Sequence, residues 1–417
     1  MATEPKQPAK SYFLSWRYIL FWVSSLLSNI GSWMQLVAQP WLVLSLSNSA
    51  FWVGFTGFAT TFPAILFTLP GGVLADRYDR KKVTIFFQVI QFFFVAALVV
   101  LLVKGWLQVW MIIVISFIVG LTDALSNPSF QTIVPSLVDH KDISRAVSLN
   151  STQFNLSRIL GPVIAGVVIA RYGGVACFSA NAISYFPFLI AIWYVYPRNK
   201  AKIRKETIQS KPVDQWREIR DLLHIHTIRL PLMTVLIANF FCGPLITFCP
   251  ILIRDVFHSG VGDYGWAMTA FGAGGLIGAG VTFLQFSGSF GRNRFASTMS
   301  VFQGMLLIIL ALLHSFLLLG LILVLSGITQ ISANISVNTF LQENAADKLR
   351  GRITSLYQLA MYSGVSLGTL VTGFMVSRWG IATSFEINGS IAIVLQSALL
   401  WRQLQQPVAE SSASKEI

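Results

Sequence analysis

Long apolar segments follow one another along almost the whole chain, and they constrain its fold more than any other feature. Crossing a lipid bilayer takes roughly 20 predominantly apolar residues. Charged residues make up 11% of the 417 residues, against about 25% in a typical soluble domain. The sequence therefore predicts an all-α membrane protein with twelve transmembrane helices. The predicted spans are 18–46, 51–75, 83–103, 106–133, 145–171, 174–196, 230–256, 264–286, 295–314, 316–341, 353–377 and 381–401.

The basic residues are distributed by membrane side. A net charge of +13 could suggest a nucleic-acid-binding surface. If both termini are cytoplasmic, however, 25 of the 30 Lys and Arg residues lie in cytoplasmic segments, as the positive-inside rule requires. The opposite side carries only Lys104, Arg171, Arg254 and Arg378. We therefore expect a multi-pass protein of the bacterial inner membrane with both termini in the cytoplasm and no nucleic-acid partner.

Residues that hold metals or cofactors form no recognisable pattern in this sequence. Cys177, Cys242 and Cys249 make no CxxC pair, and His224 and His226 would point in different directions on a helix. No span contains a nucleophile–base or metal-ligand constellation of the kind an enzyme needs. We expect no metal, no cofactor and no enzymatic activity.

A polar stretch divides the twelve spans six and six. It includes the basic run RNKAKIRKE and is the longest polar segment of the chain. The predicted organisation is an N-terminal tail, a first six-helix bundle, a central loop, a second six-helix bundle and a C-terminal tail, at 1–17, 18–196, 197–229, 230–402 and 403–417.

The two halves share a weak internal repeat. A shift of 207 positions aligns 143–184 with 350–391 without a gap, and a shift of 211 aligns the part before it. Chance agreement is easy for Leu or Ala in apolar helices but hard for spaced Arg, Gly and Asn. The repeat predicts two pseudo-symmetric six-helix bundles in the same orientation, as in parallel-repeat transporters. Matching pairs include Gly54 with Gly265, Asn127 with Asn338, Gln131 with Gln342, Arg145 with Arg352, Gly161 with Gly368, Gly166 with Gly373, Gly173 with Gly380 and Asn181 with Asn388.

The loop after the second span, GGVLADRYDRKKV at 71–83, gathers six charges in seven positions from Asp76 onward. It resembles the loop 2–3 signature of the major facilitator superfamily, G-x-L-A-D-R-x-G-R-K, with Asp79 in place of the second glycine. The resemblance implies a cytoplasmic gate in which Asp76 meets the N-terminus of span eleven near Arg350, because a helix dipole favours an anion there. The alternative is that these charges only obey the positive-inside rule. The matching residues are Gly72, Leu74, Asp76, Arg77, Arg80 and Lys81.

Two charged residues fall at bilayer depth, Asp123 in span four and Arg158 in span five. Such a charge costs about 2.5–3.5 kcal/mol on insertion scales, so it usually faces a cavity or a partner. The repeat counterpart of Arg158 is Val365, so the scaffold does not require an arginine there. Because the two spans are consecutive, we expect an Asp123–Arg158 ion pair, either static or exchanging its counter-ion for a proton. Glu386, early in span twelve, is a further candidate for proton coupling.

Amide and hydroxyl side chains recur on the spans that line the central cavity of the family fold, which are spans 1, 4, 7 and 10. With aromatic neighbours, such walls suit a large amphipathic ligand that has several polar groups. Each residue alone is equally consistent with hydrogen bonding between helices. The candidates, including two on spans five and eleven, are Gln35, Gln39, Asn127, Asn155, Asn239, Gln330, Asn334 and Tyr362.

Span five reads SRILGPVIAG, which resembles the exporter-associated motif G-x-x-x-G-P-x-x-G-G of the superfamily, with Gly161, Pro162 and Gly166 in register. Within the superfamily, NPSFQTIVPSLV, AVSLNSTQFNLSRILGP and ADKLRGRITSLY are similar to the branch of bacterial enterobactin exporters and macrolide efflux proteins. This resemblance implies a monomeric secondary active exporter of a siderophore-like or amphipathic small molecule. It also implies alternating access and protons as the coupling ion.

Two alternatives remain open from the sequence. The chain could transport lipids or a metabolite. It could also be a non-transporting membrane sensor, but a sensor should carry a sizeable soluble output domain, and the longest loop here has only about 30 residues.

Overall fold

The computed structural model is built from helices throughout the residues it describes, which are 16–138, 142–195, 222, 224–284, 289–313, 315–345 and 349–405. These helices make twelve crossings. The three consecutive elements over 226–256 together form one crossing, and the helix over 350–405 bends at Gly380 and forms two. The predicted all-α class with twelve spans is confirmed. Most of the expected tails and central loop lies outside the described residues.

The first half of the chain supplies six helices and the second half supplies the rest. Ten of the described helices are long and apolar enough to cross a membrane. The first-half helices are α1 (Trp16–Ser47), α2 (Ala50–Arg77), α3 (Arg80–Val103), α4 (Val109–Ser136), α5 (Ile143–Tyr172) and α6 (Gly174–Val195). The second-half helices are α8 (His226–Phe241), α9 (Pro244–Ile251), η3 (Leu252–Val256), α10 (Val261–Leu284), α11 (Ser289–Ala311), α12 (Phe316–Glu343) and α13 (Arg350–Gln405).

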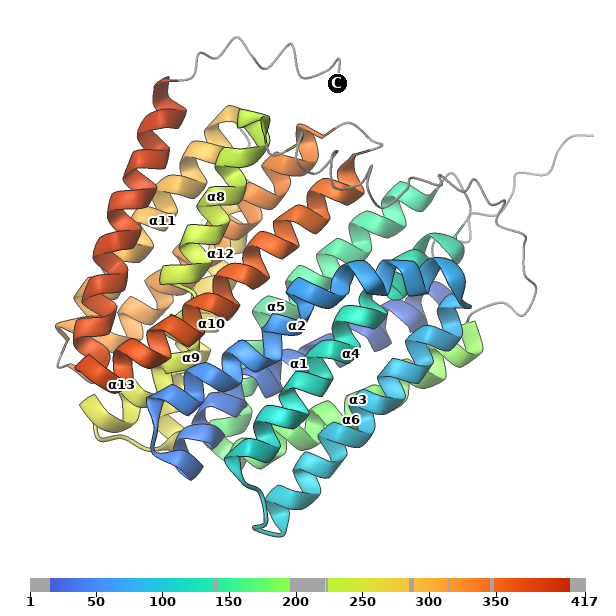
Figure 1. Ribbon diagram of the computed structural model, residues 1–417, viewed down its shortest axis with the longest axis horizontal. Coiled ribbons are helices and arrows are strands. Elements are labelled where there is room, and N and C mark those ends of the chain that lie inside the picture. The colour runs from blue at the N-terminus through green and yellow to red at the C-terminus, as the bar shows by residue number, and fades with distance from the viewer. Residues whose placement is uncertain are drawn as a thin grey trace, which may run out of the picture.

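The helices form two bundles, coloured blue to green and yellow to red in Figure 1. Between the bundles, α2 packs along α13 and α5 packs along α10. Because the number of crossings is even, Trp16 at the start of α1 and Gln405 at the end of α13 lie on the same side of the molecule. We call that side the terminal face and the opposite side the far face.

The predicted pseudo-symmetry appears in backbone and side-chain detail. Gly173 links α5 to α6 with φ 78°, and its counterpart Gly380 divides α13 with φ 80°. Both turns use left-handed backbone that only glycine adopts without strain. A side-chain hydrogen bond is repeated as well: Gln131 Nε2 donates to Asn127 Oδ1 at 3.0 Å, and Gln342 Nε2 donates to Asn338 Oδ1 at 2.9 Å.

Two symmetry-related glycine pairs hold the halves together near the far face. A methyl group built on Gly54 of α2 would lie 2.8 Å from the Cα of Gly373 on α13. A methyl group built on Gly265 of α10 would collide with the carbonyl oxygen of Gly166 on α5. Small residues allow backbones to approach this closely. These four residues, which we call the glycine seam, lie where the sequence repeat pairs Gly54 with Gly265 and Gly166 with Gly373.

Span seven, predicted over 230–256, is present but is broken within the membrane. The helix α8 ends at Phe241, and α9 begins at Pro244 after Gly243. A proline has no N–H to donate and favours the first turn of a new helix. The chain then continues from α9 into the π-helical turn η3 at the far face.

Candidate functional site

The charged loop at the terminal face is built around a helix cap. The Asp79 carboxylate accepts a hydrogen bond from the backbone N–H of Lys82 at 3.1 Å and so caps the N-terminus of α3. This role explains why an aspartate replaces the second glycine of the family signature. Lys81 donates to the carbonyl oxygen of Trp193 at 3.0 Å and lies 5.1 Å from its ring. Lys81 therefore ties α3 to α6 within the first half.

The expected gate contact at Asp76 is not formed in this conformation. Asp76 and Arg77 are exposed at the end of α2. Within the described chain, Asp76 takes part in no ion pair with another residue. An added methyl at Gly72 would meet nothing within 4 Å, whereas one at Gly71 would lie 2.7 Å from the carbonyl oxygen of Ala124 on α4. The closely packed glycine here is therefore Gly71, which precedes the motif, and not Gly72.

A polar contact closes the far face between the halves. Arg254 of η3 donates through Nη1 to Asn48 Oδ1 at 2.7 Å and to the carbonyl oxygen of Leu44 at 3.3 Å, at the end of α1. The neighbouring Asp255 pairs with the same guanidinium at 2.6 Å. Sequence analysis assigned Arg254 only to a membrane side. The signal in the sequence was that few basic residues occur on that side of the membrane, so each one needs a reason to be there.

A buried aromatic contact also joins the two halves, in addition to the hydrogen bonds of Arg254. The Tyr264 hydroxyl of α10 donates to the carbonyl oxygen of Val37 on α1 at 2.5 Å. Its ring stacks on Trp41 with centroids 5.3 Å apart. Tyr264 is fully buried, so water does not compete for these contacts. Together with the glycine seam and Arg254, Tyr264 seals the far face.

The exporter-like motif of α5 packs against two different partners. An added methyl at Gly161 would collide with the side chain of Trp33 on α1. Gly166, one and a half turns later, belongs to the glycine seam against α10. Pro162 lies inside the helix between them. The motif therefore connects the core of the first half with the contact between the halves.

Two of the candidate cavity amides instead join helices of the first half. Gln35 is buried, and its Oε1 accepts a hydrogen bond from Asn181 Nδ2 of α6 at 2.7 Å. Gln39 is also buried and donates to the Thr60 hydroxyl of α2 at 3.3 Å. Asn155 Nδ2 donates to the carbonyl oxygen of Ser151 at 2.9 Å, while its side chain stays partly exposed.

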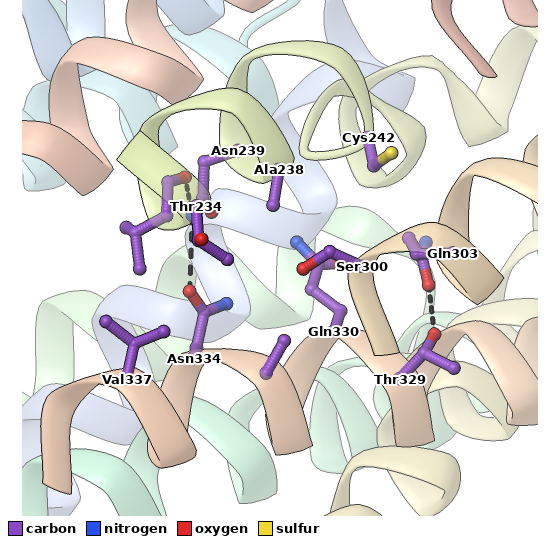
Figure 2. A pocket seen from close by; sticks show the side chains of 12 residues that line it. Thr234, Ala238, Asn239, Cys242, Ser300, Gln303, Thr329, Gln330, Asn334 and Val337 are labelled. Carbon is purple, nitrogen blue, oxygen red and sulfur yellow. Dashed lines mark hydrogen bonds between the residues drawn. The ribbon is translucent and has the colours of Figure 1, made fainter. Parts of the chain in front are cut away.

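The candidate amides of the second half surround a small polar pocket (Figure 2). Asn239 Nδ2 of α8 donates to Asn334 Oδ1 of α12 at 3.2 Å. On the other side of Gln330, the Thr329 hydroxyl bonds Gln303 Oε1. The pocket is lined by Thr234, Val235, Ala238, Asn239, Cys242, Ser300, Gln303, Thr329, Gln330, Ala333, Asn334 and Val337.

Asp123 and Arg158 lie at mid-depth but do not form the expected ion pair in this conformation. Asp123 is exposed and lies within electrostatic reach of Tyr185 on α6 and Tyr362 on α13. Because Tyr362 belongs to the second half, Asp123 faces the space between the halves. Arg158 is buried against α13, where its Nη1 lies 3.6 Å from Met361 Sδ.

Helix neighbours explain why this pair does not form. Helix α4 packs chiefly on α2 and α3, whereas α5 packs on α1 and α10. Helices α4 and α5, although consecutive in the chain, are therefore not close neighbours. Glu386 lies partly exposed shortly after the Gly380 corner, in no ion pair with a described residue. Its expected place towards the far side agrees with this position.

The fold and these sites define a transporter: two pseudo-symmetric bundles, closed against each other at one face, with charged side chains at mid-depth between them. Residues 13–416 match the family of transmembrane secretion effectors. The chain belongs to that family and is an efflux-branch transporter of the major facilitator superfamily. It is a multi-pass membrane protein and not an enzyme.

Individual relatives cover almost the whole chain. The staphyloferrin A transporter of Staphylococcus aureus is 26% identical over 405 residues, which is 94% of this chain and 98% of that protein. The multidrug efflux pump Tap of Mycolicibacterium fortuitum is 23% identical over 88% of this chain and 91% of its own length. The crystal structure of the nucleoside transporter NupG has a TM-score of 0.72 at 13% identity, with 94% of this chain and 100% of that chain covered.

Proposed function

We propose that this protein is a monomeric secondary active exporter that carries a siderophore-like or amphipathic small molecule across the bacterial inner membrane by alternating access. The observation that carries the proposal is the difference between the two faces. The glycine seam and Arg254 close the far face, whereas Asp76 at the terminal face is exposed and unpaired among the described residues. Alternating access requires close contact between the halves at one face while a gate residue at the other face is released.

The charge distribution orients the proposed transport cycle in the membrane, and relatives named as efflux proteins support the outward direction. Among the described residues, Arg80, Arg292 and Arg402 lie at helix ends on the terminal face, which the positive-inside rule assigns to the cytoplasm. The conformation described here would then receive its substrate from the cytoplasm. Closing the Asp76 loop against α13 and releasing Arg254 would open the far face and discharge the substrate outside.

Proton coupling is proposed at Asp123. This carboxylate is exposed between the halves and has no ion-pair partner among the described residues. At bilayer depth the neutral acid is favoured over the charged carboxylate. Protonation at Asp123 would therefore alternate with substrate occupancy, as antiport requires. Glu386, nearer the far face, is a second proton-binding candidate.

The substrate class rests on two observations. The relatives include proteins named as a staphyloferrin A transporter and as a multidrug efflux pump. In this chain, Asn239 Nδ2 donates to Asn334 Oδ1, and the carbonyl oxygen of Asn334 accepts a hydrogen bond from the Tyr357 hydroxyl. Amide groups beside aromatic rings suit a molecule with several polar groups on an apolar frame.

The deciding experiment compares wild-type, deletion and complemented strains grown without iron, with mass spectrometry of cells and medium. We expect a chelator to fall in the medium and accumulate in the cells of the deletion strain. Complementation with the wild-type gene should restore its export, whereas Asp123→Asn should not. Unchanged chelator levels would exclude siderophore export, and an unchanged profile in a drug-susceptibility screen as well would refute the proposed function.

A further inference from the structure

Arg158 is a buried cation without a counter-ion among the described residues. Its side chain is 8% exposed, although a guanidinium offers five N–H donors and stays charged in proteins. Its Nη1 reaches the thioether sulfur of Met361 at 3.6 Å, which is a weak acceptor, and the guanidinium also interacts with the neutral Tyr357 hydroxyl. Its Nε has no hydrogen-bond partner within the described part of the chain.

The surroundings of this guanidinium are neutral. Tyr357 and Tyr362 of α13 lie within its electrostatic reach, and neither is an anion at neutral pH. The Tyr357 hydroxyl donates to the carbonyl oxygen of Asn334 at 3.1 Å, and its oxygen offers the guanidinium a neutral acceptor rather than a counter-ion. No described carboxylate lies within ion-pair distance of Arg158.

A structural role does not account for this arrangement. Elsewhere in the chain, Arg254 has the partners of a structural arginine: a carbonyl oxygen, an amide oxygen and the Asp255 carboxylate. Arg158 instead has a thioether sulfur and a neutral hydroxyl beside it, and it forms no ion pair with a described carboxylate. At the repeat-equivalent position the second half carries Val365, so the bundle packs there without a cation.

We propose that Arg158 binds an anionic group, a carboxylate, of the transported molecule. This inference rests on the proposed export function and narrows the substrate class to amphipathic anions. A carboxylate would supply the acceptors that the guanidinium lacks, in the paired geometry that arginine favours. Because Arg158 comes from α5 and its neighbours from α13, the bound anion contacts both halves at once.

The position of Asp123 adds a second constraint on the substrate. Asp123 lies within reach of Tyr362, which is also a neighbour of Arg158. A second negative group placed there would be repelled by the ionised carboxylate. The preferred substrate therefore presents its carboxylate to Arg158 and a hydroxyl, amide or cationic group towards Asp123.

The test uses purified full-length protein in lipid nanodiscs and two fluorescent probes on the same three-ring skeleton, a zwitterionic rhodamine with a free carboxylate and its cationic methyl ester. Fluorescence polarisation should give tighter binding of the free-carboxylate rhodamine by the wild type. Loss of hydrogen bonds to a charged group should weaken binding of this rhodamine roughly 10- to 100-fold in Arg158→Gln. Arg158→Lys should retain part of it. Arg171→Gln, an exposed arginine on the same helix, should bind like the wild type.

Thermal unfolding separates this role from a structural one. Removing an unpaired buried cation should leave the melting temperature of Arg158→Gln unchanged or raised, whereas loss of a structural arginine would lower it. The proposal is overturned if the free-carboxylate rhodamine and its methyl ester bind equally, if neither binds the wild type, or if Arg158→Gln binds the free-carboxylate rhodamine normally. These results do not affect the chelator profile of the deletion strain, which tests the export function separately.

Discussion

Adding one methyl group at Gly265 should open the far face of the protein. In the described conformation, a methyl built on this residue collides with the carbonyl oxygen of Gly166 and lies 2.8 Å from the backbone nitrogen of Ala170. Both obstacles are backbone atoms, so no side-chain rotation removes the clash. Helices α5 and α10 must separate at the seam to accommodate the methyl group.

The size of the effect follows from the cost of overpacking. Forcing an extra carbon into a closely packed contact costs typically about 1–3 kcal/mol. If the cost applies only while the seam is closed, it shifts the equilibrium between closed and open far faces roughly 5- to 150-fold. Alanine is also a better helix former than glycine by about 1 kcal/mol. That gain is the same in both conformations and cancels in their ratio.

The assay is a distance measurement between spin labels on far-face loops of opposite halves. Lys104 and Leu312 are exposed there and are replaced by labelled cysteines after the three buried native cysteines are removed. Gly265→Ala should populate a longer distance. Gly262→Ala is the matched control, one turn earlier on α10, where an added methyl meets nothing within 4 Å. Identical distance distributions for both variants and the wild type would refute the reasoning.

Three further variants test the gate, the coupling and the charged loop. Arg254→Ala removes the hydrogen bonds to Leu44 and Asn48, so the same label pair should report a more open far face. An unchanged distance would show that Arg254 does not hold this face closed. Asp123→Asn cannot release a proton, so substrate-dependent proton release in everted vesicles should disappear, and its persistence would exclude Asp123 as the coupling residue. Asp79→Ala removes the cap of α3 and should lower the free energy of unfolding by about 1 kcal/mol, as measured by denaturation in mild detergent. An unchanged free energy of unfolding would mean that water replaces the cap.

The spans and the repeat could be predicted because each leaves a signal in the sequence. Apolar length marks a crossing, and spaced glycines survive in both halves where backbones must approach. The alignment paired Gly54 with Gly265 and Gly166 with Gly373. In the structure the contacts run across these pairs, from Gly54 to Gly373 and from Gly265 to Gly166. Sequence equivalence identifies related positions, but only the packing of the two halves shows which of them touch.

Local breaks and amide roles were harder to predict. The Gly243–Pro244 dipeptide is a strong helix breaker, and this signal was available although the apolar run concealed it. Gln35 and Gln39 are different, because an amide on a helix face looks the same whether it faces a cavity or another helix. Their partners Asn181 and Thr60 lie on other helices. No one-dimensional pattern identifies these partners.

The charges at mid-depth show most clearly where the sequence stops being informative. Two opposite charges on consecutive spans favour an ion pair, because sequential elements are usually adjacent. The packing of α5 on α1 and α10 removes that premise and leaves Asp123 exposed and Arg158 buried. A permanent pair would have neutralised both groups and left neither able to respond to a ligand. Their separation keeps one site able to bind a proton and another able to bind an anion, which are the two separate functions that an antiporter of an acidic substrate needs.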